Sequence, residues 1–322
     1  MKKTVSLALG AAALGTAATV AGAELLYECT MNVKFAKKVS AKIGLQDNTI
    51  AELFRTNPLF RDSMTWFRSL SLSDNVIKNS DGEEIHGYII KNESDSNKWA
   101  ICVHGYMGSP SIQSPFIKHF YDRGYNVVCP CLRAHGWDTN RYCSMGWHDK
   151  KIVLSWIDYL TCIYPGCEIV LHGVSMGAAT VMLVTGEILP YNVKCAIADC
   201  GYSSCMDVFR NVMKNNLHLP SFPLLNVANA ISRTRGNFDF SKCSPANAVS
   251  VSRTPTLFVH GTGDDFVPYS MLDVVFNACT AEKERLDIAD APHAVAVAYD
   301  PELYFNSMDN FIEKYHKTEE SL

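Results

Sequence analysis

Short, continuously apolar runs recur along the chain from about residue 99 onward. They are WAICVH (99–104), NVVC (126–129), EIVLH (168–172), CAIA (195–198) and TLFVH (256–260), and residues 285–288 are a further strand candidate. Unbroken apolar runs of this length are typical of strands buried on both faces, and segments of helical length separate them. The alternation predicts a mostly parallel central sheet with helices on both faces.

Two further strands are predicted ahead of these runs, at residues 75–78 and 84–91. The Ser80-Asp81-Gly82 segment between them holds an Asp-Gly pair, which favours a tight hairpin turn. Residues 152–160 have the apolar spacing of a helix. Residues 202 to about 250 interrupt the alternation with several prolines, and an insertion of this length predicts a lid or cap.

The amino terminus carries a charge-free stretch, Thr4 to Ala23, after two lysines. Twenty helical residues span about 30 Å, the thickness of a bilayer core. A basic start followed by apolar and then small residues is also typical of a cleaved signal peptide. We expect residues 1–23 to be a signal peptide or a membrane anchor, with the body extracytoplasmic and either anchored or secreted. Residues 24–74 are expected to form a helical extension.

Composition narrows the class of protein. The 322 residues are 48% hydrophobic and 19% charged, with a formal net charge of −4. This balance allows a large core and excludes a disordered chain. The mild acidity is not the basic footprint of a nucleic-acid-binding domain, so we expect no nucleic-acid partner. Twelve cysteines are too sparse for a disulfide scaffold, and no spacing identifies a pair.

The most informative chemical motif is G-V-S-M-G at residues 173–177. It directly follows a predicted strand and precedes a helix-like segment, which is the context of a nucleophile elbow. Ser175 would stand at the strand end, flanked by glycines that allow close backbone contacts. One oxyanion donor would be the backbone N–H of Met176, and the other that of Tyr106 in the glycine-rich loop 104–108.

An acid and a histidine should follow the serine in the chain. Asp264 or Asp265 follows a predicted strand and can orient a histidine, and His293 follows the last predicted strand. His293 would take the proton from Ser175 while the acid holds the imidazole in place. Asp199 also ends a predicted strand and is an alternative acid.

The histidines and cysteines do not form a metal-binding pattern. His104, His172 and His260 each end a strand before a glycine and are interpreted as buried histidines. The sequence holds no H-E-x-x-H and no paired C-x-x-C. The loop after His104 also lacks the Gly-Lys-Ser/Thr of a phosphate loop. We therefore expect no metal and no cofactor.

Together these motifs resemble the α/β-hydrolase superfamily, and more narrowly bacterial serine-aminopeptidase-like hydrolases with an amino-terminal membrane segment. The resemblance rests on SDG (80–82), HGYMG (104–108), RAHG (133–136), GVSMGA (173–178), ADCGY (198–202), HGTGDDFVP (260–268) and APHA (291–294). It implies an α/β-hydrolase fold over residues 75–322 with a lid inserted at about 202–250. The family pattern also selects Asp264 over Asp265 as the acid.

The sequence thus predicts a serine hydrolase that cleaves a carboxylic ester or amide through an acyl-enzyme. An esterase is favoured because esters need the least leaving-group help; a serine-aminopeptidase-like peptidase and an acyltransferase are the alternatives. A non-catalytic, membrane-tethered binding protein is the alternative of another class. The expected partner is a small-molecule ester or amide, with a membrane contact through residues 1–23 if they are retained.

Overall fold

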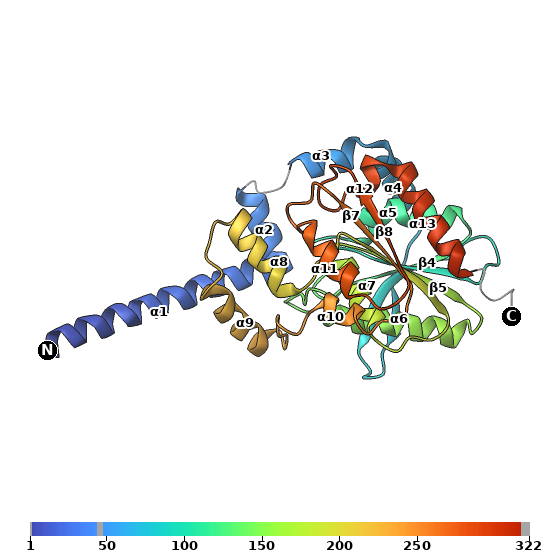
Figure 1. The fold of residues 1–322 in the computed structure, drawn as a ribbon. Coiled ribbons are helices and arrows are strands. Elements are labelled where there is room, and N and C mark those ends of the chain that lie inside the picture. The colour runs from blue at the N-terminus through green and yellow to red at the C-terminus, as the bar shows by residue number, and fades with distance from the viewer. Residues whose placement is uncertain (1, 44–47, 317–322) are drawn as a thin grey trace.

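The structure is a computed structural model that describes residues 2–43 and 48–316, with side chains at 16–39 and 52–316. The described residues form an eight-stranded sheet in the order β1-β2-β4-β3-β5-β6-β7-β8 (Figure 1). The strands are β1 (Asn75–Lys78), β2 (Glu84–Ile90), β3 (Lys98–Val103), β4 (Asn126–Pro130), β5 (Glu168–Val174), β6 (Val193–Asp199), β7 (Thr256–Gly261) and β8 (Lys283–Ile288). The β1–β2 and β2–β4 pairs are antiparallel and the others parallel. The predicted hairpin and the mostly parallel sheet are confirmed.

Both faces of the sheet are buried. In β3, the side chains of Trp99, Ile101 and Val103 belong to one core cluster, and those of Ala100 and Cys102 to a second. Successive side chains of a strand point to opposite faces, so a strand that is apolar at every position needs cover on both. All twelve cysteines lie in the part of the chain with described side chains, and all are free thiols.

Helices cover the two faces (Figure 1). One face carries α4 (Pro58–Ser69), the short η1 (Pro110–Gln113), α5 (Ser114–Asp122), α12 (Ala296–Tyr299) and α13 (Pro301–His316). The other carries α6 (Asp149–Ile163) and α7 (Met176–Thr185), beside which lie α10 (Pro245–Val249) and α11 (Ser270–Ala278). In α6 the buried positions recur at helical spacing, which leaves a polar outer face. Every residue of α7 is buried, because other elements surround this helix.

The chain ahead of the sheet is helical, with α1 (Lys2–Met31), α2 (Val33–Ile43) and α3 (Asn48–Thr56) preceding α4. Described residues of the 24–74 range form the end of α1 and then α2, α3 and α4, while residues 70–74 are not helical, and the helical extension as a unit stays a prediction. Within the described residues, no helix combines the length and the apolar character needed to cross a membrane. The prediction for residues 1–23 concerns mostly residues 1–15, whose side chains lie outside those described, and it stays a prediction.

The segment predicted as a lid follows β6. It forms α8 (Cys205–Asn211), a π-helical turn (Val212–Asn216) and α9 (Leu224–Arg235) before α10. Leu217, Leu219 and Phe222 are exposed at its outer loop. The side chains of Leu26 in α1 and Phe209 in α8 are among those that line a small apolar cavity between α1 and this segment. The lid function itself stays a prediction.

The last turns of α1 belong to the folded body. Tyr27 is fully buried, and its ring centroid lies 4.9 Å from that of Tyr142. Glu28 accepts a hydrogen bond of 2.6 Å from the Tyr142 hydroxyl. The carbonyl oxygen of Thr30 accepts one of 2.6 Å from the Tyr106 hydroxyl. This helix end is therefore tied to the loop in which the sequence places an oxyanion donor.

Truncation of Tyr27 tests how much this contact contributes to stability. Tyr27→Ala should lower the free energy of unfolding by about 3–5 kcal/mol, because it removes a buried ring and leaves a cavity. Tyr27→Phe keeps the ring and should cost about 1 kcal/mol or less. Urea unfolding monitored by tryptophan fluorescence measures both values. Equal stability of wild type and Tyr27→Ala would show that α1 does not support the fold.

Candidate active site

Ser175 stands on a tight turn between β5 and α7. Its backbone angles are φ 59° and ψ −119°, a conformation that residues other than glycine rarely adopt and that neighbouring contacts must hold. A Cβ atom on Gly177 would lie 2.0 Å from the carbonyl oxygen of Val103, and one on Gly173 would lie 2.3 Å from that of Gly177. Only glycine fits at these two positions, so the expected nucleophile-elbow geometry is present.

The three residues that the sequence singles out as a triad are hydrogen-bonded to one another. Ser175 Oγ lies 2.8 Å from His293 Nε2, and His293 Nδ1 lies 2.7 Å from Asp264 Oδ2. They follow β5, β8 and β7 respectively. Because these strands are parallel, their carboxyl ends meet at one edge of the sheet. In the neutral imidazole, Nδ1 donates to Asp264 and Nε2 accepts from the serine hydroxyl.

Asp264 is held as a charged acceptor. Burial on its own would raise the pKa of this carboxyl, but hydrogen bonds from His260 and His293 lower it below the usual value for aspartate. Its Oδ1 also accepts the backbone N–H groups of Phe266 and Val267 at 3.0 and 2.9 Å. The neighbouring Asp265 is exposed, and the structure gives it no bond to His293. Of the two acids in this loop, the structure brings Asp264 to the histidine.

Asp199, the alternative acid, has a different environment. Its carboxyl is fully buried, Oδ2 accepts the Tyr304 hydroxyl at 3.0 Å, and Oδ1 has no hydrogen-bond partner among the described residues. Burial raises the pKa of Asp199 to about 6. Its backbone carbonyl accepts the Ser175 N–H at 2.8 Å. Asp199 therefore supports the elbow through its main chain and does not orient His293.

The two backbone groups expected to stabilise an oxyanion lie on either side of Ser175. Met176 is the first residue of α7, and the first N–H groups of a helix have no acceptor within it. On the other side, a Cβ atom on Gly105 would lie 3.3 Å from the Ser175 Cβ, which brings the loop after β3 against the serine. The Tyr106 side chain points to Thr30 in α1, so only the main chain of Tyr106 is available here.

His135 holds the loop after β3 in place. The sequence motifs did not lead us to predict a role for this residue. Its Nδ1 lies 2.8 Å from the Arg133 carbonyl oxygen, and its Nε2 lies 3.1 Å from the backbone N of Met107. Nδ1 is therefore the protonated nitrogen, and Nε2 accepts the Met107 N–H. The bond fixes Met107 at φ 55°, directly after Tyr106. The RAHG segment (133–136) was the only sequence signal for this contact.

Among the described residues, Cys200, Asp264 and His293 have potential metal-binding atoms within 4.8 Å of one another. Two of these residues are already bonded to each other in the triad. Burial raises the pKa of the Cys200 thiol well above its usual value, and a protonated thiol is a poor metal ligand. The donor set fits a proton-transfer triad better than a metal centre. The expectation of no metal stays a prediction.

These features define the α/β-hydrolase fold. The sheet is mostly parallel, the serine lies on a strand-to-helix turn, and the acid and the histidine follow the last two strands. The family described as alpha/beta hydrolase fold matches residues 99–237, and the predicted fold is confirmed. The uncharacterized protein YqkD of Bacillus subtilis (strain 168) is 25% identical over 255 residues, which are 79% of this chain and 83% of that protein. A thermostable monoacylglycerol lipase of Bacillus sp. (strain H-257) is 22% identical over 238 residues, 67% of this chain and 90% of the lipase.

Solved structures give the same result for the fold. The Pyrococcus furiosus esterase Pf2001 superposes with a TM-score of 0.62 at 23% identity, over 77% of this chain and 92% of the esterase. Est1E of Butyrivibrio proteoclasticus with bound ferulic acid superposes with a TM-score of 0.58 at 17% identity, over 75% of this chain and 99% of Est1E. An acylaminoacyl peptidase of Pyrococcus horikoshii gives 0.56 at 15% identity, over 79% of this chain and 43% of the peptidase. At these identities the likeness establishes the fold alone.

The buried carboxyl of Asp199 predicts a specific pH dependence of stability. Its pKa is about 6 in the folded protein and about 4 when unfolded, so the folded state keeps the proton longer. The stabilisation that the protonated Asp199 carboxyl contributes is therefore fully present below about pH 4. It is lost as the pH rises from 4 through 6. Asp199→Asn does not titrate, so its stability relative to wild type should rise by about 3 kcal/mol between pH 4 and 8. Urea unfolding across this range measures it, and a constant difference would contradict the assignment.

Proposed function

We propose that this protein is a serine hydrolase that cleaves a carboxylic ester through an acyl-enzyme on Ser175. The observation that carries the proposal is the pair of hydrogen bonds that joins Ser175 to His293 and His293 to Asp264, at 2.8 and 2.7 Å. A serine hydroxyl is a weak nucleophile and needs an adjacent base, which needs an orienting partner in turn. All three groups are present in one constellation.

In the acylation half of the reaction, Ser175 Oγ attacks the carbonyl carbon of the ester while its proton passes to His293 Nε2. The carbonyl oxygen becomes an oxyanion and accepts the N–H groups of Tyr106 and Met176. Asp264 stabilises the imidazolium that has formed. When the tetrahedral intermediate collapses, the carbon–oxygen bond to the alcohol breaks, and the alcohol takes the proton from Nε2.

In the deacylation half, water takes the place of the alcohol. His293 Nε2 removes a proton from the water as its oxygen attacks the acyl carbon. The same two backbone N–H groups accept the second oxyanion. The bond from the acyl carbon to Ser175 Oγ then breaks, and the serine recovers its proton from His293. The net reaction consumes one ester and one water and releases an acid and an alcohol.

The ester is favoured as substrate on two grounds. An alkoxide leaves more readily than an amine, so an ester demands less of the general acid. Among the similar proteins, Pf2001 and the monoacylglycerol lipase are named for ester substrates. Likeness to the acylaminoacyl peptidase and the serine-aminopeptidase-like motifs favour a peptidase as the second candidate. An acyltransferase would use the same residues with water excluded after acylation.

Covalent labelling separates an enzyme from a non-catalytic binding protein. An alkyl fluorophosphonate should label the purified chain at Ser175, because phosphonylation needs the same activated oxygen as acylation. Ser175→Ala should abolish labelling, and His293→Ala should slow it by about a thousandfold. Ser109→Ala is the matched control: this serine lies in the loop after β3 and bonds to Ser111, so its labelling should equal wild type. If wild type reacts no faster than Ser175→Ala, the protein is not a serine hydrolase.

A substrate panel separates esterase from peptidase. We expect p-nitrophenyl esters to exceed aminoacyl p-nitroanilides in kcat/KM by about a hundredfold or more, because the anilide depends more on proton donation by His293. Ser175→Ala supplies the background rate. A preference for the anilides would support the peptidase. Turnover at the background rate for every member, with labelling intact, would favour an acyltransferase.

A further inference from the structure

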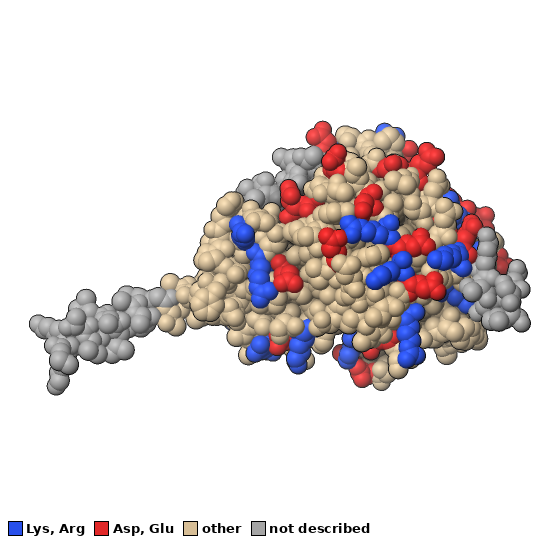
Figure 2. Space-filling view, viewed as in Figure 1, with Lys and Arg blue, Asp and Glu red and all other residues tan. Residues whose placement is uncertain are grey.

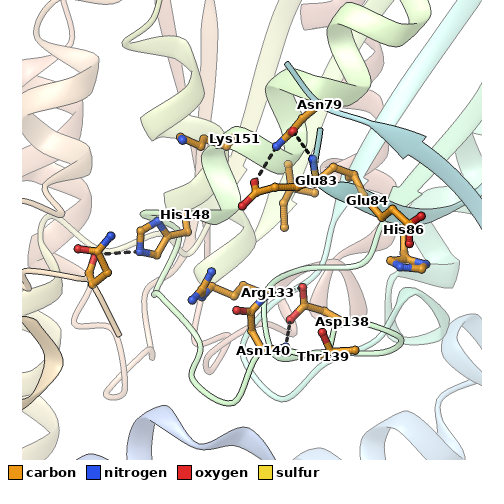
Figure 3. Close-up of a pocket in the computed structure, with 13 residues that line it drawn as sticks. Asn79, Glu83, Glu84, His86, Arg133, Asp138, Thr139, Asn140, His148 and Lys151 are labelled. Atoms are coloured by element: carbon orange, nitrogen blue, oxygen red, sulfur yellow. Dashed lines mark hydrogen bonds between the residues drawn. The ribbon is translucent and has the colours of Figure 1, made fainter. Parts of the chain in front are cut away.

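A cavity of about 660 Å³ opens beside the β1–β2 hairpin, outside the triad (Figure 3). Its walls come from that hairpin, from the loop after β4 and from the start of α6. We call it the Arg133 cavity. Its volume lies in the range of small-molecule sites, and most of the side chains that Figure 3 labels are polar or charged. These properties fit a polar ligand better than an acyl chain.

Arg133 is held rigidly at the wall of this cavity. Its backbone N–H donates to Asp149 Oδ1 at 2.8 Å, and its Nε donates to the carbonyl oxygen of Tyr142 at 3.2 Å. Among the described residues, no carboxylate pairs with the guanidinium, and its two terminal nitrogens make no hydrogen bond. Figure 3 shows the guanidinium directed between His148 and Asn140. A half-buried, oriented cation with free donors is therefore presented to the cavity.

Three acids, Glu83, Glu84 and Asp138, line the cavity, and among the described residues none of them forms an ion pair with Arg133. Asp138 Oδ1 accepts the backbone N–H groups of Ala134 and Asn140 at 2.7 and 2.8 Å, so it serves the local loop. Glu83 is exposed and accepts the side-chain amide of Asn79. The other strong base of the wall, Lys151, is exposed and lies 3.3 Å from Asp81. Arg133 is the base whose charge is left for a ligand.

His148 complements Arg133 as a hydrogen-bond acceptor. Its Nε2 lies 3.0 Å from the carbonyl oxygen of Asn237 and 3.3 Å from that of Gly236, so Nε2 carries the proton. Burial, and then the Arg133 charge, lower the pKa of His148, which keeps the ring neutral. Its Nδ1 is then the nitrogen that can accept a hydrogen bond from a ligand. An anion with a neighbouring hydroxyl or N–H group would match both residues.

We propose that the Arg133 cavity binds the anionic group of a ligand, a carboxylate or a phosphate, through the terminal nitrogens of Arg133. The planar fork of a guanidinium matches both groups in a two-point contact. The anion is either part of the ester substrate or a separate small molecule. The first source rests on the proposed hydrolase function; the second does not.

The position of the cavity allows the first source. Arg133 follows β4 and Ser175 follows β5, with β3 between these parallel strands, so both residues lie at the same edge of the sheet. The ends of β4 and β5 are two strand spacings apart, about 10 Å across the sheet. The Arg133 loop also supplies His135, which holds Met107 beside the proposed oxyanion donor. An ester substrate would therefore need its carboxylate or phosphate about 10 Å or more from the ester carbonyl to engage both Arg133 and Ser175.

Direct binding tests the proposal without reference to catalysis. Isothermal titration of the full chain with succinate and with inorganic phosphate should show binding of at least one of them. Arg133→Gln should weaken it roughly ten- to hundredfold, the size of a charge-assisted hydrogen bond, and Arg133→Lys should weaken it less. Arg253→Gln, at an exposed arginine outside the cavity, is the matched control and should bind as wild type. Equal binding by Arg133→Gln and wild type, or no binding to wild type, overturns the proposal.

Kinetics then distinguish the two sources of the anion. The ratio of kcat/KM for an aryl hemisebacate, whose eight methylenes can span about 10 Å, to that for the matching aryl decanoate is measured in wild type and Arg133→Gln. If binding and this ratio both fall about tenfold or more, the anion belongs to the substrate. If binding falls and the ratio is unchanged, the anion is a separate ligand; both results support the site. Fluorophosphonate labelling checks that the variants are folded, and its absence in wild type would refute the hydrolase function alone.

Discussion

The approach of Gly177 to the carbonyl oxygen of Val103 is the contact on which the rest of the site depends. A Cβ atom would lie 2.0 Å from that oxygen, so no other residue lets α7 start so close to β3. The close approach requires a tight turn at Ser175, whose φ is positive. The turn places the serine side chain at the end of β5. Neighbouring strands then supply each partner: β8 leads to His293, β7 to Asp264 and β3 to Tyr106.

Two buried aspartates near this edge show how local hydrogen bonds decide charge. Asp264 receives two backbone N–H groups and two imidazoles, which outweigh burial and lower its pKa. Asp199 receives one hydroxyl, and burial then dominates and raises its pKa, with the Asp264 charge adding to the rise. Below about pH 6, Asp199 is mostly protonated, and Asp264 is the carboxylate hydrogen-bonded to His293. In the proposed acylation, the imidazolium of His293 would be stabilised by the Asp264 carboxylate to which it is hydrogen-bonded.

The strands and the triad were predictable because local patterns encode them. Continuous apolar runs marked the sheet, and the spacing around Ser175 with the late position of His293 marked the chemistry. The Arg133 cavity was not predictable, since its walls lie far apart in the chain and its free guanidinium depends on where each acid finds a partner. The bond from His135 to Met107 likewise depends on two loops meeting in space. The face of the molecule in Figure 2 carries acidic and basic side chains side by side.

Helix α1 is continuous from Lys2 to Met31, and its final turns are bonded to the body through Glu28 and Thr30. No loop interrupts the path from its first residue to the segment that touches Tyr106. At 1.5 Å per residue, its thirty residues extend over about 45 Å. Because its last turns are bonded to the body, the direction of this helix is fixed relative to the edge of the sheet that carries Ser175. The angle between the helix axis and the sheet is thus determined by the packing of Tyr27 and the hydrogen bonds of Glu28 and Thr30.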